Sequence, residues 1–541
     1  MTARILLVGL DGFEPSLAAR LISEGRLPAL DEPLERGATI ALDHGAARRT
    51  GLAWEHISTG KSPDDAERWA AVDFDPRTYQ AVQRTTDLTP FLAELGTSAV
   101  VFDAPYFDLK AAPNVQGLTS WGAHDPGVVP FARPRDLRRD IDRRFGPYPA
   151  SEFIYGFVWP SPERCRDMGN ALIKAVERRA EIADFLFAER LPEWQLGLVV
   201  ISEYHSAIEA LWHGVDPAHP LRGHASAAAA RQGVEGVYEA GDRMLARLIR
   251  RFPDAQIVAF NLHGMGANNS DVPSMLLLPE LLYRDHFGRP YFATPDWATS
   301  DGGPPLLGPD DSWECAVASG FPDEKSGTTR TPAAIRAYRK LVRALGLAGP
   351  TRLPLDWMPA ARYQPSWPAM PAFALPSFYD GRIRLNLQGR EAAGTIAPAA
   401  AEAACDRLET LLMECTDPLT GEPIVSEVVR TAKNPLALTE SEADLVILWR
   451  GSPLGLHHPR LGRIGPLPYR RTGGHTGGDG VAYFSDPQGL ANVSAMSAFD
   501  LIPTVLAMLG EELPRLSGVS RWQAGQQEPC GDAPLRQTVP Q

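Results

Sequence analysis

The feature that most constrains the fold is a short apolar run, RILLVGL (4–10), which ends at Asp11-Gly12. An uninterrupted apolar run of this length is typical of a parallel strand that is buried on both faces. Strands that alternate with helices predict an α/β fold with a doubly wound, mostly parallel sheet flanked by helices. The sequence shows this alternation, with further strand-like runs at 97–103, 196–202, 255–261 and 443–449 and helical patterns at 15–30, 168–190, 226–251, 332–346, 398–414 and 498–510.

Two long regions interrupt the alternation. Residues 105–165 are rich in proline, glycine and aromatic residues, and residues 275–395 end in a proline-rich stretch. Long segments of this kind inside compact domains are often functional, so we expect both to cover a site. We predict a core of residues 1–275 and 430–518 with an irregular insertion at about 105–165, an inserted cap or substrate region at 276–429, and a polar C-terminal tail at 519–541.

The charge and the cysteines exclude some classes of partner. The 541 residues carry a formal net charge of −13, which argues against a nucleic-acid partner because clustered lysine and arginine hold phosphate backbones. No apolar run approaches the roughly 20 residues that span a bilayer, so we expect no membrane partner. The five cysteines lack C-x-x-C spacing, and the N-terminus enters a strand pattern without a signal peptide. We therefore expect a cytoplasmic protein with reduced thiols.

Polar side chains that can bind metals follow several of the predicted strands. The first strand ends at Asp11, and the run at 196–202 leads into SEYHSAIEALWH (202–213), where His205 and Glu209 are four residues apart. The carboxyl ends of parallel strands meet at one edge of a sheet, where ligands bind. The alternative for 202–213 is a solvated helix start, in which the helix dipole favours acidic residues. Because several such groups fall at one predicted edge, the sequence favours a metal site there, with further candidates at Glu203, Asn261, His263 and His475.

A hydroxyl group adds to this set. Thr50 lies directly before a helix-like stretch, whose N–H groups favour an oxyanion or a phosphate. The alternative for Thr50 is an ordinary cap or turn residue. The nearby TGKS (59–62) is not a phosphate-binding P-loop, because it lacks the first glycine at the required spacing and follows no strand.

The motifs together resemble a known family. The stretch LLVGLDGFEPSLAARLISEGRLPAL, followed by Thr50-x8-TG-x-x-P up to Pro63, is similar to the type I phosphodiesterase/nucleotide pyrophosphatase family of the alkaline phosphatase superfamily. The segments 381–396, 471–489 and 498–517 resemble later parts of the same family. This resemblance implies an alkaline phosphatase-like fold with inserted cap regions. It also implies that Thr50 attacks phosphorus at a site with two divalent cations, which can stabilise the attacking and the leaving oxygen.

The resemblance implies two sets of metal ligands. The first consists of His205, Glu209 and His475; where the family has Asp-x3-His, this chain has His205 and Glu209. Two imidazoles and a carboxylate suit Zn²⁺ best, with Mn²⁺ or Fe as alternatives. The second set is one carboxylate short, because Leu262-His263-Gly264 stands where the family has Asp-His-Gly. It retains Asp11, Thr50 and His263, and Glu203 or Asn261 is an alternative replacement for the missing carboxylate.

From these residues we predict a metal-dependent hydrolase or transferase of phosphate esters or diesters that uses Thr50 and one or two divalent cations per chain. Sulfate or phosphonate esters, or a mutase reaction, are alternatives on the same scaffold. A degenerate relative that binds or scaffolds without catalysis is an alternative from another class. A nicotinamide-dependent enzyme is excluded, because no G-x-G-x-x-G follows the first strand. The expected partner is a small phosphate- or sulfate-type anion, and a homodimer is compatible with the sequence.

Overall fold

The computed structural model describes residues 4–31, 37–122, 128–154, 161–299, 303–308, 312–322, 352–431, 434, 436–437, 442–490 and 492–523. The helix expected at 332–346 and residues 524–541 of the predicted tail lie outside the described residues. None of the helices within these ranges is long and apolar enough to cross a membrane.

A central sheet forms the larger lobe, which we call the main lobe. The interior strands β9, β1, β8, β5 and β6 run parallel, and antiparallel pairing joins β21 between β9 and β2. This topology confirms the predicted α/β class with a mostly parallel sheet. The nine strands lie in the order β22 (Ala495–Ser497), β2 (Ala38–Asp43), β21 (Asp479–Phe484), β9 (Ala255–His263), β1 (Arg4–Leu10), β8 (Leu196–Ile201), β5 (Ala99–Phe102), β6 (Gln116–Leu118) and β7 (Ala132–Arg133).

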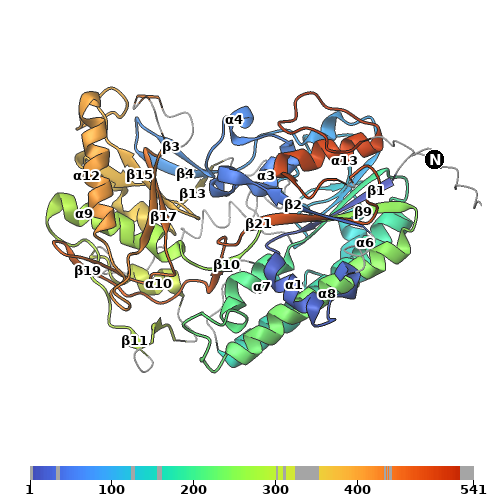
Figure 1. Cartoon of the computed structure of the whole chain (residues 1–541), viewed down its shortest axis with the longest axis horizontal. Coiled ribbons are helices and arrows are strands. Elements are labelled where there is room, and N and C mark those ends of the chain that lie inside the picture. Colours follow the sequence, from blue (N-terminus) through green and yellow to red (C-terminus); the bar gives the residue numbers. More distant parts are fainter. Residues whose placement is uncertain are drawn as a thin grey trace, which may run out of the picture.

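Helices cover both faces of this sheet because its strands are apolar on both sides. Leu6 and Val8 of β1 belong to the core on one face, whereas Ile5 and Leu7 belong to the core on the other. Figure 1 shows α6 and α8 below the sheet and α3 and α13 above it. The first core contains α1 (Pro15–Ser23), α5 (Leu137–Phe145), α6 (Pro162–Asp184), α7 (Glu203–Leu211) and α8 (Ala227–Arg251), and the second contains residues of α3 (Ala53–Thr59) and α13 (Leu501–Leu509).

A second lobe has its own core and its own sheets, and it lies on the left of Figure 1. Its larger sheet is antiparallel, in the order β14 (Ala372–Ala374), β15 (Gly381–Leu385), β17 (Leu445–Trp449) and β16 (Val425–Arg430). A smaller sheet joins β13 (Arg352–Pro354), β4 (Gln80–Arg84) and β3 (Val72–Asp75). The helices of this lobe are α9 (Leu278–Phe287), α10 (Trp313–Ala318) and α12 (Ala401–Met413), and a hairpin is formed by β18 (Leu456–His458) and β19 (Gly462–Ile464).

The lobe boundaries differ from the predicted ones. The run at 443–449 forms a strand, but β17 pairs with β15 in the second lobe instead of joining the main sheet. The core of the second lobe includes residues as early as Phe74 and as late as Tyr469, so the predicted limits at 276 and 429 are wrong. A buried apolar run predicts a strand, but it does not say which sheet the strand joins.

Most of the irregular insertion at 105–165 extends the main sheet and its cores, while its Tyr106 also lines the cavity described below. It supplies β6 and β7 to the edge of the main sheet, and its α5 packs into the core that contains α6 and α8. Phe107 and Leu109 are buried in the core on the other face of the sheet. Its apolar residues are scattered among proline and glycine, so no periodic pattern reveals that this segment extends the sheet.

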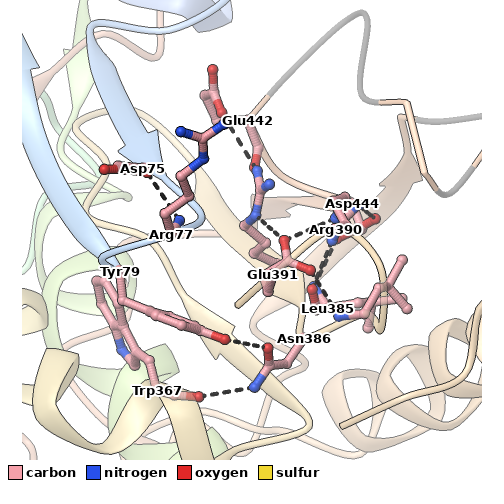
Figure 2. Close-up of polar contacts among 12 residues, drawn as sticks. Asp75, Arg77, Tyr79, Trp367, Leu385, Asn386, Arg390, Glu391, Glu442 and Asp444 are labelled. Carbon is pink, nitrogen blue, oxygen red and sulfur yellow. Dashed lines mark hydrogen bonds and ion pairs between the residues drawn. The ribbon is translucent and has the colours of Figure 1, made fainter. Parts of the chain in front are cut away.

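The segment 381–396, one of the motifs that carry the family resemblance, folds around buried ion pairs between its side chains. The guanidinium of Arg390 donates to both carboxylate oxygens of Asp444, at 2.8 and 2.7 Å, and to Glu391 at 2.8 Å. Arg384 donates to the same Glu391 at 2.7 Å. We call these four residues the closed network; Figure 2 shows Arg390 between Glu391 and Asp444. Because each charge lies against an opposite charge, the network ties β15 to the segment that leads into β17.

Candidate metal centre

The candidate site forms where two neighbouring parallel strands end. Leu10 of β1 lies opposite Ile201 of β8, so the residues that follow both strands lie at the same edge of the sheet. Gly12 allows the two chain segments to meet, because a Cβ atom at this position would lie 2.4 Å from the Cα of His205. This close contact places Asp11 beside the first turn of α7, as the strand-end prediction requires.

Three predicted ligands converge at this edge. His205 and Glu209 lie one turn apart on α7, and both are buried. His475 follows β20 (Gly473–Gly474), which packs so closely on α7 that a Cβ atom at Gly473 would lie 2.2 Å from the carbonyl oxygen of Ile208. Of the residues that the structure describes, these three form the one group of imidazoles and carboxylates whose ligand atoms all lie within 4.8 Å of one another.

The geometry of this group fits a divalent cation. The Nε2 atoms of His205 and His475 are 3.0 Å apart, and Nε2 of His205 lies 3.6 Å from Oε1 of Glu209. Ligand nitrogens bound to tetrahedral Zn²⁺ at about 2.0–2.1 Å are about 3.3 Å apart, close to the first distance. We call His205, Glu209 and His475 the metal cluster. These residues could hold a cation with little movement of their side chains.

Two arginines that the sequence analysis did not single out lie beside the metal cluster. Arg471 forms an ion pair with Glu209, and its other nitrogens contact the two carboxylate oxygens of Asp271 at 2.8 and 2.9 Å. Burial lowers the pKa of Arg471 to about 10, so the guanidinium is charged at neutral pH. Arg470 contacts the same Asp271 at 3.1 Å. The dipeptide Arg470-Arg471, five residues before His475, is the signal that could have drawn attention to them.

Asp11 lies at the cavity but has a protein partner. Its Oδ1 accepts a hydrogen bond of 2.8 Å from the indole N–H of Trp54, whereas Oδ2 is buried without a hydrogen-bond partner among the described residues. Burial raises the pKa of Asp11 to about 7, and the Trp54 hydrogen bond opposes this shift. Trp54 is a residue that sequence reasoning missed, because no local pattern reveals a contact across 43 residues.

His263 lies within a row of imidazoles. Its ring is 5.3 Å from that of His475 and stacks at 6.2 Å on that of His44. The Nδ1 atom donates to the carbonyl oxygen of Gly264 at 3.1 Å. Behind it, Nε2 of His44 and Nδ1 of His56 are 3.0 Å apart, and burial lowers the pKa of all three histidines, that of His56 to about 3. Neutral rings that stack in this way fix the orientation of His263.

The two alternative ligands for the second site are engaged elsewhere. Glu203 accepts three hydrogen bonds from the buried guanidinium of Arg179, which also donates to Asp103. Asn261 lines the cavity, but its amide donates to the carbonyl oxygens of Phe13 and His263 at 2.9 Å each. Its Oδ1 accepts from the backbone N–H of Val481. Neither residue joins the metal cluster, because each holds together parts of the chain that are distant in sequence.

Thr50 lies next to the cavity and not in its lining. It ends the 3₁₀ turn Gly45–Thr50, and its hydroxyl donates to the carbonyl oxygen of Ala47 at 2.8 Å and accepts from the N–H of Leu52 at 3.1 Å. The next residue, Gly51, does line the cavity. The structure therefore brings Thr50 to the border of the site, with its hydroxyl turned to its own backbone.

The metal cluster opens on a cavity of about 660 Å³, a volume typical of small-ligand sites. Residues of both lobes line it, among them Asp11 and Trp54 of the main lobe and Leu353 and Phe378 of the second. Arg470 lies at the second-lobe side, 5.2 Å from the ring of Trp357, and the ring of Tyr379 meets that of His475 edge-on at 4.4 Å. The aromatic residues of the lining are Trp54, Tyr106, Trp357, Phe378 and Tyr379.

Comparison with known proteins gives structural similarity only. No family model matches the chain, and no curated protein sequence matches it. Among solved structures, phosphonoacetate hydrolase from Sinorhizobium meliloti in complex with phosphonoformate aligns with 13% identity over 90% of each chain, at a TM-score of 0.43. Murine ectonucleotide pyrophosphatase/phosphodiesterase 5 in complex with AMP aligns with 11% identity over 95% of this chain and 96% of its own, at 0.43. Alkaline phosphatase PafA aligns with 10% identity over 96% of this chain and 98% of its own, at 0.49.

Proposed function

We propose that this chain is a metal-dependent hydrolase of phosphate esters or diesters. The observation that carries the proposal is the metal cluster, in which His205, Glu209 and His475 converge within 4.8 Å beside a cavity of about 660 Å³. Zn²⁺ suits two imidazoles and a carboxylate best, and Mn²⁺ or Fe are alternatives. A cation bound there would supply a Lewis acid for the negative charge of a phosphoryl oxygen.

The side chains around the cluster support an anionic substrate with an apolar or aromatic body. Arg470 and Arg471 line the cavity, where guanidinium groups that already pair with Asp271 can also donate to a negatively charged group beside the cluster. Trp54, Trp357 and Phe378 belong to an aromatic wall that favours burial of an apolar group. The phosphoester would then lie beside the metal cluster, with its organic group against these aromatic rings.

Thr50 is the nucleophile in this proposal, as the family resemblance implies. Its neighbour Gly51 lines the cavity, so the proposal requires the Thr50 hydroxyl to leave the Ala47 carbonyl and turn toward the ligand. Asp11, which lines the cavity and has a pKa near 7, is suited to take up a proton at neutral pH.

Binding without turnover is the second candidate, and one observation favours it: the Thr50 hydroxyl is hydrogen-bonded on both sides to its own backbone. The two candidates share the cavity and the metal cluster. They differ only in whether a bound ester is cleaved.

The decisive experiment measures metal content and hydrolysis together. Wild type, His475→Ala and the control His457→Ala, which changes an exposed histidine on β18, would be purified and loaded with Zn²⁺ or Mn²⁺. We expect bound metal and hydrolysis of p-nitrophenyl and bis(p-nitrophenyl) phosphate in wild type and control, and loss of both in His475→Ala. Metal binding without hydrolysis of either ester would favour the second candidate. Metal-free wild type after loading would refute both.

A further inference from the structure

The Asp11 side of the cavity lies where the family resemblance implies a second cation. Hard divalent ions are bound by several oxygen ligands, and carboxylate charge raises the affinity of such a site. The number of carboxylate oxygens that the chain can offer there decides whether a second ion is held. This inference rests on the proposed function and concerns how many cations the same site takes.

Asp11 is the carboxylate at this position, and one of its two carboxylate oxygens already accepts a hydrogen bond from the protein. Its Oδ1 accepts the indole N–H of Trp54 at 2.8 Å. Trp54 is itself held in place, because it lies on α3 and its ring contacts that of Phe260 in the core at 5.9 Å between centroids. Asp11 is 8% exposed, and only Oδ2 remains without a hydrogen-bond partner among the described residues.

The residue beside His263 adds no oxygen at all. Leu262 is 7% exposed and lies in the core that contains residues of α3 and α13, although it also lines the cavity. The isobutyl side chain of Leu262 therefore makes one side of the second cation position apolar. A cation there would lose its hydration shell without receiving a ligand in return.

The alternative donors cannot replace the missing carboxylate. Glu203 is bound on both oxygens by Arg179, and removing it from that fully buried pair would leave a charge without compensation. The amide of Asn261 bridges Phe13, His263 and Val481. His263 offers a neutral nitrogen and Thr50 a neutral hydroxyl, so a single carboxylate oxygen would face a doubly charged ion.

We propose that this chain holds one divalent cation, on the metal cluster, and that Trp54 and Leu262 turn the neighbouring position into a subsite for ligand atoms. Oδ2 of Asp11 is left to form a hydrogen bond with a polar group of the ligand, while Leu262 and Trp54 contact its apolar part. Trp54 is a positioning residue here, since it acts through Asp11.

The test counts cations on the full-length protein. Wild type, Asp11→Asn, and the double variants Trp54→Phe/Leu262→Asp and Trp54→Phe/Leu262→Asn would be titrated with Mn²⁺ by calorimetry. The Asn double variant is the matched control, because it has the size of the Asp variant without its charge. We expect one equivalent in wild type, Asp11→Asn and the control, and two equivalents in Trp54→Phe/Leu262→Asp.

Electron paramagnetic resonance of the Mn²⁺-loaded proteins gives a second readout that does not depend on activity. We expect the spectrum of an isolated ion in wild type and exchange coupling between two ions in the Asp double variant. Two equivalents in wild type, or loss of one on Asp11→Asn, would overturn this inference and leave the proposed function standing. A folded Asp double variant that still binds one ion would overturn the role given to Trp54 and Leu262; if it does not fold, the counts for wild type and Asp11→Asn decide. Zero equivalents in wild type would instead refute the proposed function.

Discussion

The closed network of the second lobe and the metal cluster of the main lobe are both buried groups of ionisable side chains, but they differ in how their charges are paired. In the closed network, Arg390 lies between Glu391 and Asp444, and every cation faces a carboxylate. In the metal cluster, two imidazole nitrogens face each other at 3.0 Å. The metal cluster is also paired in part, since Glu209 lies against Arg471, but its two imidazole nitrogens converge beside a cavity, as metal ligands do. Convergence of ligand nitrogens beside a cavity, more than the density of charge, separates the candidate site from the structural cluster.

The largest effect that we expect is a loss of hydrolysis when the proposed nucleophile beside the metal cluster is removed. Thr50→Ala should lower hydrolysis of bis(p-nitrophenyl) phosphate by roughly 10⁴-fold or more, because loss of a nucleophile removes the covalent route. The free energy of unfolding in urea should change little, since the hydroxyl bonds only neighbouring backbone. Thr59→Ala is a matched control, because that hydroxyl also bonds backbone, in α3. Hydrolysis at the wild-type rate in Thr50→Ala would mean that water, and not Thr50, attacks phosphorus.

Breaking the closed network should lower the free energy of unfolding and leave metal binding unchanged. Arg390→Met leaves Asp444 without its guanidinium partner while Glu391 keeps Arg384, and breaking a buried pair costs about 3–5 kcal/mol. Urea unfolding would measure this loss, and Zn²⁺ stoichiometry should equal that of wild type. Arg450→Met, a change at an exposed arginine just beyond β17, should leave stability unchanged. Loss of zinc in Arg390→Met would show that the two groups are coupled.

Metal removal should produce a smaller effect, confined to the metal cluster. At a free Zn²⁺ concentration of 100 times its Kd, the free energy of unfolding should rise by about 2.7 kcal/mol over the chelator-treated protein. Urea titrations with and without Zn²⁺ would measure it. His475→Ala should abolish the increase, whereas Arg390→Met should retain it from a lower baseline. An equal increase in His475→Ala would mean that zinc binds elsewhere.

The smallest effect that we expect, counted per pH unit and per residue, is the change in stability caused by the buried histidines that follow α7. Burial lowers the pKa of His213 to about 3 and that of His219 to about 4. The unfolded chain takes up protons near pH 6.5 while the folded chain does not. Stability is therefore complete above pH 6.5 and falls toward pH 4 by about 1.4 kcal/mol per pH unit for each histidine.

Urea unfolding at pH 7, 6 and 5 checks this slope. His213→Gln removes one of the buried titrating histidines while leaving a polar side chain opposite Ser226, so its stability should fall less steeply with acid than that of wild type. Identical slopes in the two proteins would contradict the assignment to His213.

The sequence predicts those parts of the fold that depend on local pattern. The buried runs at 4–10, 196–202 and 255–261 become β1, β8 and β9 because each is apolar on both faces. The run at 443–449 becomes a strand as well, but its sheet is decided by pairing with β15, which is more than 60 residues away. Long-range pairing leaves no periodic trace in the sequence, so the lobe boundary is misplaced.

The site shows the same division. His205, Glu209 and His475 come together as the motifs imply, since strand ends and a glycine-rich turn dictate their positions. Glu203 has the same chemical character as its neighbours, but a partner on α6, Arg179, keeps it from the cavity. Trp54 contacts Asp11 without any local sequence signal, whereas Arg471 is marked only by its place in an arginine pair before His475. Residue type indicates what a side chain can bind, whereas the fold determines whether that capacity is already used.

The second lobe is assembled from separate parts of the chain. It takes β3 and β4 from residues 72–84, and most of its remaining core from residues 272–469, with main-lobe strands and helices in between. A fragment cut from the middle of the sequence would therefore lack two of its strands and expose β13 along one edge. The chain also crosses between the lobes several times, so a hinge at the cavity would have to bend several segments together. Truncation is for this reason a poor way to isolate either lobe, and cross-linking of neighbouring segments a better way to learn how far the cavity opens.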